Sequence, residues 1–123
     1  DKNDVRLQCE RELKATLIRL RQGYIAAAAN KKLVRDILIS TANGLLPLLR
    51  AILWLKDIDR PKLAKSTFDK AAQHLSININ PLINARNWKY QKPRLQENAI
   101  ITTFESIYNT VEQLAILVDE LTF

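Results

Sequence analysis

The chain contains no methionine, one cysteine, one histidine, two glycines and four prolines. A single cysteine excludes an internal disulfide. Because there is also only one histidine, a zinc site built from protein ligands alone is not expected. Gly23 and Gly44 are too far apart for either common glycine-rich phosphate loop. So few turn residues also argue against an all-β sandwich or barrel. These absences exclude several classes of protein without naming an activity.

The positive charge is concentrated in the middle of the sequence. Nineteen Lys and Arg residues against thirteen Asp and Glu residues leave a formal net charge of +6. Residues 30–93 carry twelve basic and four acidic side chains, whereas residues 94–123 carry one and five. Such asymmetry either offers a basic face to a polyanion or draws the last helix onto the middle of the chain. A solvated face on which neighbouring charges cancel is the third interpretation.

No targeting or membrane-spanning segment is predicted. The polar start of the chain lacks the apolar stretch of a secretory signal. The most apolar run, residues 44–55, is interrupted by Pro47 and Arg50 and is too short to span a bilayer. The lone Cys9 fits a reducing compartment, so we expect a cytoplasmic protein without a membrane partner. Because the sequence starts at Asp1 and has no methionine, we expect it to be part of a longer polypeptide.

Hydrophobic periodicity predicts helices throughout. The pattern of apolar residues at spacings of three and four predicts five helices, over residues 4–29, 31–56, 61–76, 81–90 and 94–122. Residues 31–56 leave one polar stripe, and Pro47 lies on it, where a kink would bend the helix around the core. A single kinked helix is favoured over a break at Gly44, because Leu46 would be a poor cap for a new helix. The sequence therefore predicts an all-α, up-and-down helical bundle of about five helices, three long and two short. It forms one domain, residues 1–123.

The last helix has the clearest core pattern. Its apolar positions alternate spacings of four and three through three heptads, at Ile100, Phe104, Ile107, Val111, Leu114, Val118 and Leu121. The corresponding face of the first helix holds Val5, Cys9, Leu13, Leu17, Leu20 and Tyr24.

Three features could carry chemistry, and each has a plainer structural interpretation. Asp57 and Asp59 have the spacing of a metal-binding carboxylate pair, but they precede a proline where acidic residues cap a helix. His74 has no second histidine to work with, and Cys9 lies on an apolar helix face. We therefore expect no catalytic residue, no metal site and no cofactor.

One stretch of sequence favours contact with phosphates. Residues 86–94 combine four cations and two aromatic residues without an acid, a combination suited to pairing phosphates and stacking bases. The alternative is that the aromatic residues plug the end of the bundle and the cations are solvated. A second basic cluster lies at the start of the second helix. The candidate contact residues are Arg86, Trp88, Lys89, Tyr90, Lys92, Arg94, Lys31, Lys32 and Arg35.

Three segments together resemble a helical region found C-terminal to bacterial nucleotidyltransferase-like domains of the polymerase-beta superfamily type. They are residues 5–13 with 17–24, the proline-bearing residues 45–53, and residues 104–121, which end in Leu-Val-Asp-Glu-Leu. The resemblance covers nearly the whole chain, but its motifs are helix-packing patterns. The catalytic glycine-serine and paired aspartates of such enzymes belong to the preceding domain and match nothing here.

The resemblance implies a non-catalytic accessory domain. Such a domain would pack on an upstream nucleotidyltransferase-like domain, assist substrate binding, or pair with a second subunit. The alternative is an autonomous helical module that binds nucleic acid. A standalone enzyme has no recognisable set of residues in this sequence.

Overall fold

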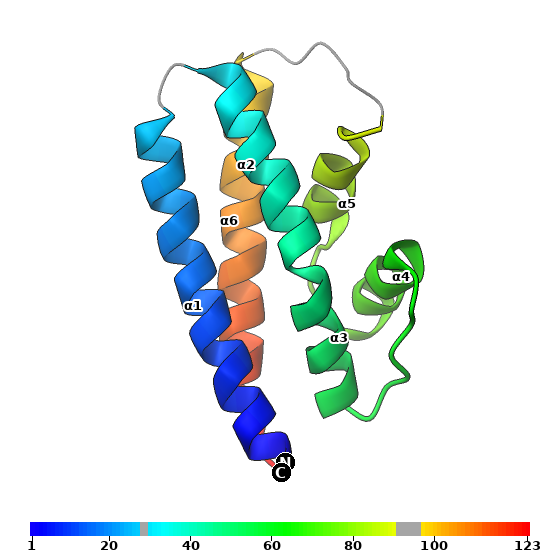
Figure 1. Cartoon of the computed structure of the whole chain (residues 1–123). Helices are drawn as coiled ribbons and strands as arrows, with labels where there is room; N and C mark the ends of the chain where they lie inside the picture. The colour runs from blue at the N-terminus through cyan, green and yellow to red at the C-terminus, as the bar shows by residue number, and fades with distance from the viewer. Residues whose placement is uncertain (28–29, 91–96) are drawn as a thin grey trace.

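The computed structural model describes residues 1–27, 30–90 and 97–123, and within these ranges every regular element is an α-helix (Figure 1). The helices are α1 (Lys2–Ala26), α2 (Lys31–Gly44), α3 (Leu46–Leu55), α4 (Ala64–His74), α5 (Asn80–Asn87) and α6 (Glu97–Glu120). The long helices α1, α2 with α3, and α6 pack together, and α4 and α5 lie on the α2–α3 side. The predicted all-α helical bundle is confirmed.

A single hydrophobic cluster joins all six helices. The predicted heptad positions Ile107, Val111, Leu114 and Val118 of α6 are fully buried. On α1, Leu13 and Leu20 are buried in the same cluster. Phe104 is half-buried, and its ring stacks on Tyr24 of α1 with the ring centroids 4.2 Å apart. At roughly 1.5–3 kcal/mol for each buried aliphatic side chain, this cluster is the main stabilising element.

The predicted kinked second helix is present as α2 and α3, which meet at Leu45. The backbone of Leu45 is itself right-handed helical, and its amide donates to the carbonyl of Thr41. Pro47 is exposed on the outer side and lacks an N–H, so the helical ladder weakens at this point. The alternative prediction was a break at Gly44. The structure has a local interruption at Leu45, next to Gly44, and the helix continues beyond it.

The segment Lys31–Leu55 is the one described helical stretch that is long and apolar enough to cross a membrane, by length and composition alone. From the sequence, the apolar run 44–55 within this segment was predicted to be too short to span a bilayer. In the structure this segment packs against α1, α4, α5 and α6. Only 33% of its most apolar window is buried, so packing in the bundle accounts for part of its apolar composition.

The end of α1 differs from the prediction. The sequence extended this helix through the alanines to Asn30, but α1 ends at Ala26, and residues 28–29 lie outside the described part. Asn30 starts the next helix instead of stopping the first, because its side-chain oxygen accepts a hydrogen bond from the amide of Leu33.

The start of α4 also differs from the prediction, which placed it at Pro61. The helix begins at Ala64, because Arg50 of α3 holds the preceding residues in a loop. The Arg50 guanidinium donates hydrogen bonds to the carbonyls of Pro61 and Lys62 and to the hydroxyl of Thr67. Bonds from a charged donor to backbone carbonyls outweigh the local preference of proline for a first helical turn.

The two chain ends meet at one end of the bundle (Figure 1). The ammonium of Lys2 donates to Asp57 Oδ1 at 2.6 Å and to the carbonyl of Leu55. It also lies over the rings of Trp54 and Phe123. Lys2 thus connects the start of α1, the end of α3 and the C-terminal residue.

Candidate phosphate-contacting surface

Arg86 lines a small cavity of about 200 Å3 between α4 and α5. Lys65 and Asp69 of α4 and Asn87 of α5 also line it. Two cations against one carboxylate leave this cavity with an excess positive charge, and an amide side chain adds donor and acceptor atoms. The volume accommodates a phosphate or carboxylate group and is smaller than the pockets that hold drug-sized ligands.

The Arg86 side chain is only partly satisfied. Its Nε is buried and has no hydrogen-bond partner among the described residues. Its Nη2 donates to the hydroxyl of Tyr90 at 3.5 Å, and the guanidinium lies 5.3 Å from the centre of that ring. A buried donor without an acceptor is costly, and the rest of the guanidinium can pair with an anion in the cavity that Arg86 lines.

The predicted basic stretch divides into buried and exposed parts. Trp88 is 9% exposed and belongs to the core, as the plug interpretation expected. Tyr90 is 65% exposed, so its ring does not plug the bundle. Lys89 is exposed beside it, with its ammonium 6.0 Å from the centre of the Tyr90 ring. Lys92 and Arg94 lie outside the described residues.

The second basic cluster occupies the first turns of α2. Lys31 and Lys32 are exposed, and Arg35 is half-buried. The Nε of Arg35, like that of Arg86, is buried without a hydrogen-bond partner in the described chain. No acidic residue stands in the first turn of α2. Three cations beside the positive end of the helix dipole raise the local positive potential, which favours an anion.

The two basic clusters lie toward the same end of the bundle. Helices α2 and α5 pack against each other and run in opposite directions, so the start of α2 and the end of α5 point the same way (Figure 1). We call these clusters together the basic end, defined by Lys31, Lys32, Arg35, Arg86 and Lys89. Sequence reasoning did not predict that Lys65 and Asp69 would line a cavity with Arg86, because that depends on how α4 lies beside α5.

Cys9, His74 and Asp57 differ in their burial and in their partners. Cys9 is buried, and burial followed by the nearby Glu12 raises the pKa of its thiol, which disfavours the reactive thiolate. His74 is exposed in the last turn of α4, and Asp57 pairs with Lys2. Among the described residues, no group of three or more His, Cys, Asp or Glu side chains could hold a metal ion.

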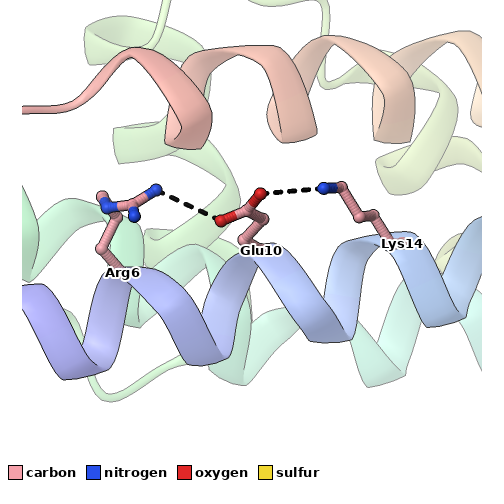
Figure 2. Close-up of polar contacts among 3 residues, drawn as sticks. All are labelled: Arg6, Glu10 and Lys14. Atoms are coloured by element: carbon pink, nitrogen blue, oxygen red, sulfur yellow. Dashed lines mark hydrogen bonds and ion pairs between the residues drawn. The ribbon is translucent and has the colours of Figure 1, made fainter.

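A carboxylate pair at the α1–α6 interface was not predicted. Glu10 of α1 accepts hydrogen bonds from Lys14 at 2.8 Å and from Arg6 at 3.3 Å (Figure 2). Its pKa is lowered to about 2, first by Lys14 and then by a hydrogen bond with Asp119 of α6. The same bond raises the pKa of Asp119. Perturbed carboxyl pairs occur in active sites and in structural ion-pair networks alike. Arg6 lies one turn before Glu10 and Lys14 one turn after it on α1, which is the spacing of ion pairs along a helix surface.

A comparison of the chain with protein families, with curated protein sequences and with solved structures gives no match.

Proposed function

We propose that this chain is a non-catalytic helical accessory domain that contacts phosphate groups through its basic end. The observation that carries the proposal is the Arg86 cavity, where a buried and unpaired Nε faces no acceptor within the described chain. Arg35 on the adjacent helix α2 also has a buried Nε without a hydrogen-bond partner among the described residues, which supports the proposal. The burial of Cys9 supports the non-catalytic part of the proposal.

The parent molecule in this proposal is a nucleotidyltransferase-like protein. The accessory domain would pack on its catalytic domain, help to hold a phosphate-bearing substrate, or pair with a second subunit. The coding region upstream of Asp1 tests this part directly. A glycine-serine followed by paired aspartates in the same reading frame supports it. A start codon or a signal peptide immediately upstream overturns it.

Phosphate contact is tested by titrating the chain with a nucleoside triphosphate in a calorimeter. Arg86→Gln should raise the Kd at least about tenfold, because a charge-assisted hydrogen bond is lost. The double variant Arg35→Gln/Arg86→Gln should lose more. The matched control Lys56→Gln/Lys62→Gln removes the same charge from exposed side chains and should bind as the unmodified chain does. Equal binding by all variants would contradict the proposal.

An autonomous nucleic-acid-binding module is the second candidate. The observation that favours it is the exposed ring of Tyr90, which has the charged groups of Arg86 and Lys89 within about 6 Å of its centre. An exposed ring flanked by cations can stack on a base while the cations pair with phosphates. A labelled single-stranded oligonucleotide should then bind at low salt, and log K should fall linearly with log salt. Absence of binding at low salt removes this candidate and leaves the accessory-domain proposal untouched.

A further inference from the structure

A long groove of about 910 Å3 runs between α1 and α2. It is lined on α1 from Gln8 to Ala27 and on the other side from Leu33 of α2 to Leu48 of α3. At 1.5 Å per residue the α1 wall is about 28 Å long, which is five turns of helix. An elongated groove between two antiparallel helices fits a third helix better than a compact ligand.

Small side chains let another backbone approach the groove. Gly23, Ser40, Thr41 and Gly44 line it. At Gly23 the two helices come close together, since an added Cβ would lie 3.2 Å from Ile37 Cδ1. At Gly44 an added Cβ would meet no atom within 4 Å. At Gly44 the groove is therefore open to the close approach of another helix.

The charges on the α1 wall identify the occupant. Glu12 and Arg19 are both exposed, both line the groove, and stand two turns apart on one helix face. If a second α1 packs antiparallel with its two-fold axis between Ala15 and Thr16, Glu12 of each copy faces Arg19 of the other. A two-fold interface requires this reciprocity, in which residue i contacts residue j and j contacts i. The small Ala15 side chain lies at the crossing point.

The overall charge of the chain also favours this face. The chain carries +6, yet the charged residues of the groove are Glu12, Asp36 and Arg19, which leave it acidic. Two copies that meet through the groove therefore bring together the surface where their mutual repulsion is weakest.

We propose that a second copy of this chain docks its α1 antiparallel in the α1–α2 groove and forms a two-fold dimer. Two reciprocal Glu12–Arg19 pairs set the register of the helices. The inference does not rest on phosphate contact, which involves different residues, so either proposal can fail alone.

Charge reversal tests the proposal by light scattering coupled to size-exclusion chromatography. The unmodified chain should have twice the 14.1 kDa mass of one copy. Glu12→Arg and Arg19→Glu should each weaken dimerisation at least about tenfold, since each places like charges opposite one another. An equal mixture of the two variants should dimerise again, because every facing pair is then of opposite sign.

Matched controls separate the register from general charge effects. Glu112→Arg and Lys62→Glu make the same charge changes at exposed positions away from the groove and should remain dimeric. Circular dichroism confirms that each variant folds. If one single variant does not fold, the double variant Glu12→Arg/Arg19→Glu, which should dimerise with itself, replaces it. A monomeric unmodified chain, a dimer insensitive to the reversals, or a mixture that stays monomeric each overturns the proposal.

Discussion

Gly23 and Gly44 both lie in helices, but the methyl group of an alanine would have different surroundings at the two positions. Neither Gly23 nor Gly44 has a positive φ, so alanine fits the backbone of both. At Gly44 the added Cβ enters open space, whereas at Gly23 it lies 3.2 Å from the end of the Ile37 side chain, which has to shift. The local geometry therefore separates two substitutions that look equivalent in the sequence.

In the monomeric chain, with the proposed dimer broken by Glu12→Arg, Gly44→Ala should raise the free energy of unfolding by about 0.5–1 kcal/mol, because alanine loses less backbone entropy in a helix. Gly23→Ala should gain less, since the crowding at Ile37 offsets part of the benefit. Urea unfolding of both variants at one protein concentration measures the difference. A larger gain for Gly23→Ala would show that α1 and α2 are less closely packed at this point than described.

The Glu10 ion pairs should make stability depend on pH. Glu10 has a folded-state pKa of about 2 against an ordinary value of 4.5. Its stabilising contribution is therefore complete above pH 4.5 and is lost as the pH falls toward 2. Asp119 acts in the opposite sense, because its pKa is raised and the folded state loses stability as the pH rises above 3.8. The two effects have to be separated by mutation.

An Asp119→Asn background isolates Glu10. At pH 7, adding Glu10→Gln to this background should lower the Tm, because Lys14 and Arg6 lose their carboxylate partner. The difference in Tm between the two proteins should shrink as the pH falls from 4.5 toward 2. A Tm difference that stays constant over this range would show that Glu10 makes no pH-dependent contribution.

At the scale of the element, α6 illustrates how much a periodic pattern predicts. The spacing of its apolar residues depends only on helix geometry, so the sequence identified which of them are buried. Helix ends depend on individual capping and loop contacts, and the predicted end of α1 and start of α4 were wrong, whereas the predicted start of α2 was right. The start of α4 is set by Arg50 from α3, eleven residues or more away from the carbonyls that it binds.

Ile107 and Ile116 provide a matched test of the register of α6. Ile107 is 0% exposed and Ile116 is 57% exposed. Ile107→Asp should leave the chain unfolded, because burying a carboxylate without a partner costs more than about 4 kcal/mol. Ile116→Asp should change the stability by less than about 0.5 kcal/mol. Thermal melts followed by circular dichroism measure both, and a wild-type-like melt for Ile107→Asp would refute the register.

At the scale of the whole molecule, one core predicts one unfolding transition. The buried residues of all six helices form a single cluster. Trp54 lies in α3 beside Lys2 of α1, and Trp88 follows α5, so tryptophan fluorescence reports on α3 and on the end of α5. Fluorescence and far-ultraviolet circular dichroism should give the same midpoint in urea. Separate midpoints would show that the bundle unfolds in more than one step.

The candidate site was predictable only in part, for a related reason. The sequence identified Arg86 and Arg35 because each belongs to a cluster of basic residues, and such a cluster can be recognised from the sequence alone. It could not identify Lys65 or the α1–α2 groove, because both depend on the angle and spacing at which neighbouring helices pack in space. The burial of Trp88 beside the exposed Tyr90 also depends on where α5 ends.

The meeting of the two chain ends determines how the fold responds to a mechanical load. Helices α1 and α6 are antiparallel neighbours, and the start of one lies beside the end of the other (Figure 1). A force that pulls the ends apart acts across this interface, so it peels the two helices from one end, one turn after another. The Lys2 contacts with Asp57 and with the Phe123 ring would break first. Traction at the termini therefore unzips this bundle instead of shearing it.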